Sequence, residues 1–272
     1  METIQFVHMT DTHMNAPGRD LWDVSMTEKA KRIFQDVKAS GYKPAFVVIT
    51  GDLAQEGNLE DYAYIRKLVD EGSALVGAPV YVTLGNHDHR SPFRAGYLGE
   101  APSEGPYYYS TTVGGLRLIG LTSQVPGEET GFGFIDQKQL DFLAEELKTT
   151  APQGTVIAFH HPMLKIVDIA AKYNLTNAEE VSAVLKTGRD IVGVFAGHVH
   201  SNNIGHYDGI LNVAAAGSTY VGRRIGDGLI GGHNFCSYNL VTVTNLQATV
   251  QTIILPTSNE EFFRVDMTYF AD

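Results

Sequence analysis

The stretch that most constrains the fold of this chain is a strand pattern that leads to a carboxylate. The apolar run Ala45–Ile49 predicts a buried β-strand, and Gly51 and Asp52 follow shortly after it. In open α/β sheets, ligands bind outside the carboxyl ends of the strands. A charged side chain at such an end therefore indicates function more than structure. We take Asp52 as the point on which other strand ends converge.

Strand and helix patterns alternate through the first 200 residues. Helix-start signatures stand at Ser25 and Asn58, a Gly- and Pro-rich loop runs up to Pro106, and Gly114-Gly115 predicts a hairpin. Beyond this part, glycines punctuate short strand patterns. We expect one α/β domain over residues 1–272 with two sheets. The strand-rich part from about 203 to 272 is expected to complete the second sheet.

Charge and cysteine content bound the partners and the compartment. The 20 basic and 31 acidic residues give a net charge of −11, which argues against a nucleic-acid polymer or an anionic membrane as main partner. A small anionic substrate stays open, because bound cations can invert the local field. The single cysteine, Cys236, excludes an intrachain disulfide, and no signal segment or apolar run of about 20 residues is found. We therefore expect a soluble cytoplasmic protein.

Residue types that bind metals stand at or just after five predicted strand ends. These residues are Asp11, His13, Asp52, Asn86, His160, His198 and His200. Carboxylate, amide and imidazole ligands suit Mn, Fe, Zn or Co better than thiolate-loving metals. Seven ligands are too many for one ion and fit two, so one carboxylate must serve both, and Asp52 is the candidate bridge. Two ions about 3.5–4 Å apart form the clamp used for in-line displacement at phosphorus.

Each motif taken singly has an ordinary structural explanation. A lone Asp-x-His or His-x-His is weak evidence, a loop histidine is more often a surface residue, and Gly-Asp is a common turn signal. The ten histidines are not unusual for 272 residues. Five such motifs at five strand ends, in a fixed order, are hard to obtain by chance.

The ordered motifs resemble those of the calcineurin-like metallophosphoesterase superfamily. They read Asp11-Thr12-His13, Gly51-Asp52, Gly85-Asn86-His87-Asp88, His160 and Gly197-His198-Val199-His200. They cover residues 11–200, and no expected ligand is missing. The His160-His161-Pro162 context and the Gly-Asn-His-Asp-x-Arg form look most like the bacterial class III phosphodiesterases, which act on cyclic nucleotides and glycerophosphodiesters.

The resemblance implies a fold and a role for each position. The fold would be a four-layer sandwich of two mixed β-sheets flanked by helices. The first metal ion would be held by Asp11, His13, Asp52 and His200. The second would be held by Asp52, Asn86, His160 and His198. The nucleophile would be a metal-bound hydroxide, and His87 would be the catalytic residue that protonates or stabilises the leaving oxygen.

Several other polar residues have weaker claims. Asp88 either orients His87 or is a turn residue, and His8 and His161 are expected to pack behind the ligands. Two arginines, Arg90 and Arg94, are candidates for phosphate binding, although a solvated surface position is the more common use. Pocket-lining roles stay open for three residues after the last motif: Arg223, Arg224 and His233.

The leading hypothesis is a dinuclear-metal phosphodiesterase for small phosphodiesters, of the cyclic-nucleotide or glycerophosphodiester type. A phosphomonoesterase, or a nucleotide or phosphonate-ester hydrolase, would use the same metal centre. A non-catalytic scaffold of the same fold is the remote alternative, because every ligand and His87 are present. The resemblance also implies a dimer or higher homo-oligomer that associates through C-terminal strands.

Overall fold

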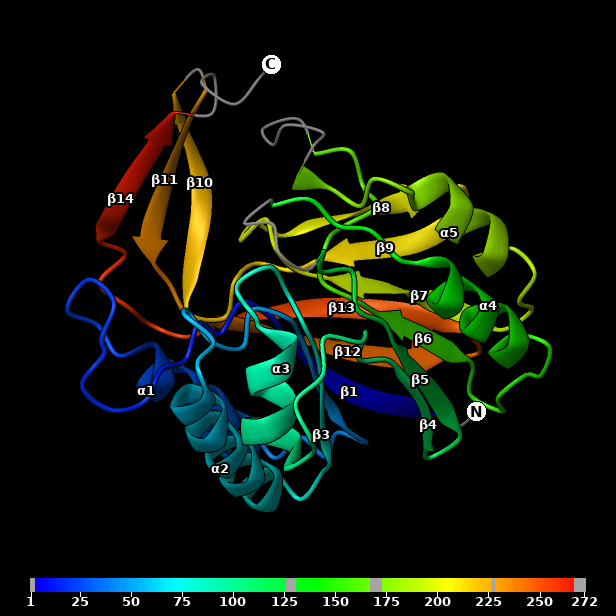
Figure 1. Ribbon diagram of the computed structural model, residues 1–272, viewed down its shortest axis with the longest axis horizontal. Helices are drawn as coiled ribbons and strands as arrows, with labels where there is room; N and C mark the ends of the chain where they lie inside the picture. Colours follow the sequence, from blue (N-terminus) through cyan, green and yellow to red (C-terminus); the bar gives the residue numbers. More distant parts are fainter. Residues whose placement is uncertain (1–2, 126–130, 167–172, 227, 267–272) are drawn as a thin grey trace.

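The structure is a computed structural model that describes residues 3–125, 131–166, 173–226 and 228–266. Two mixed β-sheets face each other, and helices cover both outer faces (Figure 1). This is the four-layer sandwich that the motif resemblance predicted. In the described residues, no helix combines the length and the apolar character that a bilayer span requires.

The first sheet contains five strands in the order β13-β12-β1-β2-β3. The parallel members β1 (Thr3–Met9), β2 (Val47–Thr50) and β3 (Val80–Thr83) run side by side, and β12 (Ser237–Thr244) and β13 (Gln247–Ile254) extend the sheet antiparallel. Helices α1 (Met26–Ala39) and α2 (Leu59–Val76) connect the parallel strands. Their side chains share one buried cluster with this sheet, so both helices cover its outer face.

The second sheet contains six strands in the order β4-β5-β6-β7-β9-β8. Its strands are β4 (Tyr109–Val113), β5 (Leu116–Gly120), β6 (Thr155–Ala158), β7 (Ile191–Ala196), β8 (Asn203–Tyr207) and β9 (Ile210–Ala214). Helices α4 (Gln137–Glu146) and α5 (Ala178–Leu185) pack against its outer face in a second buried cluster. The hairpin predicted at Gly114-Gly115 joins β4 to β5 and is confirmed.

Strand β1 shows how the sequence serves both sides of a sheet. Its side chains alternate, so that Val7 and Met9 join the helix-side cluster while Ile4 and Phe6 join the cluster between the sheets. The ring of Phe6 meets Phe195 from the opposite sheet edge-on, with centroids 5.1 Å apart. Burial on both faces therefore fixes the register of this strand.

Both predicted helix starts are confirmed by their capping contacts. The side chain of Ser25 accepts a hydrogen bond from the Glu28 backbone N–H, and that of Asn58 accepts one from the Asp61 N–H. These contacts satisfy N–H groups that have no partner inside the helix. Helices α1 and α2 therefore begin where the local sequence specifies.

The prediction that residues from about 203 to 272 complete the second sheet is wrong for most of them. Strands β8 and β9 join that sheet, whereas β12 and β13 extend the first sheet. A third, antiparallel sheet is formed by β10 (Tyr220–Gly226), β11 (Leu229–Asn234) and β14 (Glu261–Asp266). It stands beside the sandwich (Figure 1). Alternating strand patterns do not specify which sheet edge a strand joins, because every open edge offers the same backbone groups.

The segment predicted as loop before Pro106 contains helical turns. A short helix α3 (Arg90–Phe93) continues into a π-helical turn η1 (Arg94–Leu98). Phe93 and Tyr97 stack with ring centroids 5.1 Å apart, and both are buried. Tertiary packing of these aromatic side chains stabilises helical turns that their Gly- and Pro-containing sequence does not favour.

Candidate metal centre

The loops that carry the motifs meet at one edge of the sandwich. The backbone N–H of Asp11 donates to the Gly51 carbonyl at 3.1 Å, and that of His13 donates to the Asp52 carbonyl at 2.9 Å. In the second sheet, the Gly197 N–H that follows β7 donates to the His160 carbonyl that follows β6, at 2.9 Å. The rule that strand ends gather functional side chains therefore holds in both sheets.

Four of the seven predicted ligands form a first group. One donor atom from each of Asp11, His13, Asp52 and His200 lies within 4.8 Å of the others, and all four residues are buried or nearly so. The Nε2 atom of His200 lies 3.2 Å from Asp11 Oδ1 and 3.2 Å from His13 Nε2. The four donor atoms are thus close enough together to hold one metal ion.

The other three ligands form a second group around His160. Its Nε2 atom lies 3.2 Å from Asn86 Oδ1 and 3.3 Å from Asp52 Oδ2. The His198 ring meets the His160 ring edge-on at a centroid distance of 5.1 Å. Asp52 Oδ2 also lies 3.8 Å from His13 Nε2, so the same carboxylate oxygen faces both groups. This is the position that a bridging carboxylate requires.

His161 lies closer to the second group than its predicted packing role requires. A donor atom of His161 lies within 4.8 Å of donor atoms of His160 and His198. Its Nδ1 atom is hydrogen-bonded to Ser123 Oγ at 2.8 Å, which holds the ring in place. His8, in contrast, is buried against Phe195, with Nε2 bonded to Thr50 Oγ1 at 2.9 Å.

The backbone at the metal centre is strained. Positive φ values between 43° and 72° occur at Asp11, His13, Asp52, His198 and His200. Residues other than glycine rarely adopt this region, and such strain persists only where the surroundings enforce it. The carboxylate of Asp11 supplies one such constraint, because it accepts the His198 N–H at 3.1 and 3.0 Å. These backbone conformations are therefore unfavourable locally, and the surrounding fold enforces them at the residues that carry the donor atoms.

Gly85 is required where the second and third motifs meet. A Cβ atom at this position would collide with the Asp52 side chain and would lie 2.8 Å from His160 Nε2. The glycine therefore lets the loop that carries Asn86 approach the bridging carboxylate closely.

Backbone carbonyls set the tautomers of two predicted ligands. Nδ1 of His160 donates to the Thr50 carbonyl at 2.7 Å, and Nδ1 of His200 donates to the Tyr220 carbonyl at 3.2 Å. Since a carbonyl oxygen only accepts, each Nδ1 carries a proton, so in the neutral ring it is Nε2 that presents its lone pair to the centre. Sequence reasoning missed Tyr220, whose only signal was its position after the last motif.

His87 is half-buried and lies beside the first group. Its backbone N–H donates to Asp52 Oδ1 at 2.9 Å, and its ring meets the His13 ring edge-on at a centroid distance of 4.9 Å. Nδ1 donates to the carbonyl of Gln55 at 3.0 Å. Nε2 is thus the ring atom that remains for proton transfer.

Asp88 joins the loops of the second and third motifs. Its buried carboxylate accepts hydrogen bonds from the N–H groups of Leu53, Ala54 and Gly85 and from the Tyr62 hydroxyl. The ring of His87 is held by Gln55 instead. Of the two roles considered for Asp88, the structure therefore supports the loop-forming one.

Burial and charge oppose each other at the centre. Burial favours neutral carboxyl groups, but the neighbouring His200 and His160 hold the pKa of Asp11 well below its usual range, and His160 and His87 do the same for Asp52. Burial disfavours a charged His160, yet Asp52 and Asp11 raise its pKa to about 9. The pKa of His13 is lowered to about 3, chiefly by burial. The centre therefore holds two buried, ionised carboxylates that attract positive charge.

This donor set fits bound cations. Nε2 of His200 lies 3.2 Å from Asp11 Oδ1, and the Nε2 atoms of His13 and His160 lie 3.8 and 3.3 Å from Asp52 Oδ2. The two carboxylates favour positive charge among these nitrogens, since they raise the pKa of both His160 and His200, and a bound cation would supply that charge and leave the Nε2 lone pairs free to ligate. Imidazole and carboxylate donors suit divalent ions such as Mn, Fe, Zn and Co, and the donors do not select among these.

The arginines near the motifs serve the fold. Arg90 is buried, with its guanidinium bonded to Gln124 and to the Glu104 carbonyl. Arg94 pairs with Glu100 at 2.8 Å and also contacts backbone carbonyls. Both groups are therefore occupied, which is contrary to a role in phosphate binding. Outside the centre, Arg223 and Arg224 lie on β10 and His233 on β11 of the third sheet.

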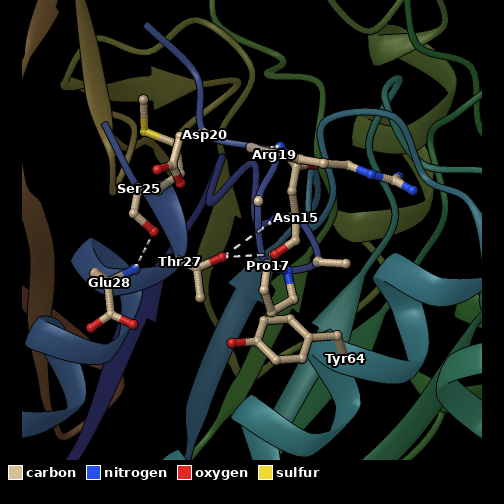
Figure 2. Close-up of a pocket in the computed structure, with 11 residues that line it drawn as sticks. Asn15, Pro17, Arg19, Asp20, Ser25, Thr27, Glu28 and Tyr64 are labelled. Carbon is tan, nitrogen blue, oxygen red and sulfur yellow. Dashed lines mark hydrogen bonds between the residues drawn. The ribbon is translucent and has the colours of Figure 1, made fainter. Parts of the chain in front are cut away.

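Two hollows lie near these loops, and only one of them touches the predicted site. A pocket of about 480 Å³ is lined by Gln55, Glu56, Asn86, His87 and His89. A smaller pocket of about 190 Å³ lies at the start of α1, between the loop of Asn15 and the ring of Tyr64 (Figure 2). None of the seven predicted ligands lines the smaller pocket. The larger pocket is therefore the candidate substrate site.

Comparisons with known proteins agree with this geometry. A probable cyclic nucleotide phosphodiesterase of Rhodococcus erythropolis is 37% identical over 215 residues, which cover 78% of this chain and 70% of that protein. A cAMP/cGMP dual specificity phosphodiesterase of Mycobacterium tuberculosis is 37% identical over 213 residues, 77% of this chain and 66% of that protein. A probable glycerophosphodiester phosphodiesterase of Arcobacter nitrofigilis is 25% identical over 219 residues, 79% of this chain and 78% of that protein.

Solved structures share the architecture. A dimetal phosphatase from Danio rerio matches with a TM-score of 0.54 at 14% identity, over 93% of this chain and 99% of that chain. A purple acid phosphatase from yellow lupin matches with a TM-score of 0.55 at 13% identity, over 97% of this chain and 53% of that chain. At these identities the likeness shows the fold alone.

The family profile for calcineurin-like phosphoesterases matches residues 4–202. This range includes every predicted metal ligand and His87, and it covers the greater part of the 272 residues. With ordered motifs, a shared fold and a matching profile, the chain belongs to the calcineurin-like phosphoesterase family.

Proposed function

We propose that this protein is a dinuclear-metal phosphodiesterase that hydrolyses small phosphodiesters of the cyclic-nucleotide or glycerophosphodiester type. The relatives described above are named for these two substrate classes. The observation that carries the proposal is the place of Asp52. One carboxylate oxygen faces both donor groups, and the other accepts the N–H of His87.

We assign the first ion to Asp11, His13, Asp52 and His200, and the second to Asp52, Asn86, His160 and His198. When bound, the two ions supply Lewis acidity at phosphorus and lower the pKa of water. Hydrolysis adds water across one P–O bond, so that the water oxygen ends on phosphorus and a proton ends on the departing alcohol.

His87 is the group that we assign to deliver that proton. Nδ1 is held by the Gln55 carbonyl, so Nε2 takes up a second proton and gives it to the leaving oxygen. Asp52 fixes the backbone of His87 at 2.9 Å, which places the ring relative to the donor groups. The carboxylate that faces both donor groups therefore also positions the residue that we assign as proton donor.

Three further properties belong to this proposal. Residues 1–272 form a single domain. The third sheet serves as a contact between copies of the chain, because its outer strands β10 and β14 pair with no other described strand on their outer edges. The compartment is the cytoplasm, which accords with the single cysteine. The metals are drawn from Mn, Fe, Zn and Co.

The test compares two chromogenic substrates on protein loaded with Mn. Bis(p-nitrophenyl) phosphate should be hydrolysed with a higher kcat/KM than p-nitrophenyl phosphate. Elemental analysis of the purified protein should find two metal ions per chain. Faster hydrolysis of the monoester would favour a phosphomonoesterase with the same centre, and no hydrolysis of either would contradict both.

A further inference from the structure

The pocket beside His87 has a lining of one chemical kind. Its five lining residues are all polar: Gln55, Glu56, Asn86, His87 and His89. Neither a lysine or arginine nor a hydrocarbon side chain lines it. An apolar ligand would gain little binding free energy in this pocket, because apolar ligands bind through burial against apolar side chains.

Among the lining residues, Glu56 has a carboxylate that is available to a ligand. Its side chain is exposed at this pocket, and no described residue forms a hydrogen bond or an ion pair with its carboxylate. A free carboxylate only accepts hydrogen bonds and carries a negative charge. It therefore favours a ligand group that donates hydrogen bonds, and it repels an anionic group.

The loop that carries Glu56 is held against the His87 loop. A Cβ atom at the next residue, Gly57, would lie 2.8 Å from the His89 ring and 3.0 Å from the His87 carbonyl. Gly57 also has a φ of +64°, which favours glycine. On the other side, the Gln55 carbonyl accepts the proton of His87 Nδ1. The position of Glu56 relative to His87 is thus set by close backbone contact on both sides.

The place of His87 orients a substrate in this pocket. Its ring contacts the His13 ring of the first donor group, and the same residue lines the pocket. If His87 gives its proton to the leaving oxygen, the alcohol bound to that oxygen extends into the pocket. This step rests on the proposed phosphodiesterase function.

We propose that the pocket of Gln55, Glu56 and His89 is the subsite for the departing alcohol, and that Glu56 selects alcohols that carry hydrogen-bond donors, either hydroxyl or ammonium groups. Alcohols without donors, and alcohols that carry a further phosphate, are disfavoured. Glu56 acts on binding, so its effect is expected mainly in KM.

The experiment uses symmetric diesters, in which both alcohols are the same and the leaving group is known. The full chain loaded with Mn is assayed on bis(2,3-dihydroxypropyl), bis(2-aminoethyl) and dipropyl phosphate, with release of the monoester followed by phosphorus NMR. Bis(p-nitrophenyl) phosphate reports whether the chain is a phosphodiesterase at all. Glu56→Gln keeps the size of the side chain and removes its charge, and Glu71→Gln on α2 is the matched control outside the pocket.

The wild type should prefer a donor-bearing diester over dipropyl phosphate, and Glu56→Gln should reduce that preference about ten-fold, mainly through KM, which corresponds to about 1.4 kcal/mol. Glu71→Gln should keep the wild-type preference. A higher rate on the dihydroxypropyl or on the aminoethyl diester identifies hydroxyl or ammonium as the donor. A wild type without preference, or a preference intact in Glu56→Gln, overturns the subsite while leaving the hydrolase in place. Lack of hydrolysis of every diester, bis(p-nitrophenyl) phosphate included, overturns the proposed function instead.

Discussion

The phenol ring of Tyr220 stacks on the imidazole of His200, with ring centroids 4.0 Å apart and planes inclined by 22°. The Tyr220 hydroxyl lies 3.4 Å from His13 Nε2, and its carbonyl accepts the proton of His200 Nδ1. Trp22 meets the Tyr220 ring edge-on and stacks on Phe262 of the third sheet. One buried tyrosine thus joins two predicted ligands to the part of the chain that stands beside the sandwich (Figure 1).

Replacing the Tyr220 ring should weaken metal binding. Tyr220→Leu keeps the backbone carbonyl but removes the surface on which His200 rests, and loss of such supporting contacts typically lowers metal affinity by about 10–100-fold. Titration with Mn, followed by activity and by calorimetry, measures this change. Tyr220→Phe keeps the ring and should bind Mn much more tightly than Tyr220→Leu. Equal affinities in the two variants would show that stacking does not support the site.

Asp52→Ala should remove metal from both groups, because the same carboxylate oxygen faces His13 and His160. We expect less than one metal ion per chain after purification, and a loss of activity of at least about 10³-fold, since bound ions supply several kcal/mol at the transition state. Elemental analysis and the bis(p-nitrophenyl) phosphate assay give the two readouts. A variant that keeps two ions would exclude Asp52 as the bridge.

His87→Ala should keep its metal and lose rate. The ring of His87 is not among the assigned ligands, and general acids typically contribute roughly 10²–10⁴-fold. The loss should be larger for alkyl diesters than for p-nitrophenyl diesters, because p-nitrophenolate departs without a proton. Loss of metal in this variant, or an equal effect on both kinds of leaving group, would argue against the assigned role.

Asp88→Ala should destabilise the fold. The carboxylate accepts from three backbone N–H groups and the Tyr62 hydroxyl, and its removal leaves these buried donors without a partner. Each such donor costs about 1–3 kcal/mol, so a loss of about 3 kcal/mol or more in the free energy of unfolding is expected. Denaturation in urea measures it. Asp36→Ala on α1 is a comparison variant, because it removes only one partner of the Tyr238 hydroxyl. It should lower the free energy of unfolding by less than Asp88→Ala does. A change under 1 kcal/mol for Asp88→Ala would contradict the loop-joining role.

Chelation should lower both activity and thermal stability, and Mn should restore both. Without cations, the buried carboxylates Asp11 and Asp52 repel each other, and among the described residues only imidazoles lie close enough to balance their charge. An ion that binds only the folded state at 100 times its Kd stabilises that state by about 2.7 kcal/mol. Thermal unfolding with EDTA, and after addition of excess Mn, checks this. A Tm that does not respond to either treatment would mean that the centre binds no ion under these conditions.

Much of this protein was predictable from local patterns. The seven predicted ligands follow strand ends, and the carboxyl ends of parallel strands meet at one edge of a sheet, so their convergence follows from the sequence and one topological rule. The starts of α1 and α2 were likewise predictable, because a capping side chain satisfies N–H groups only three residues away.

Only the tertiary structure decided the partners that lie far apart in the chain. The stacking of Tyr220 on His200, the hold of Gln55 on His87 and the distribution of the C-terminal strands over three sheets depend on which edges and faces come together. Local sequence specifies a residue's conformation and polarity, whereas its distant contacts are set by packing of the whole chain. The motifs therefore determined which residues form the centre, whereas the residues that position them were decided by the tertiary structure alone.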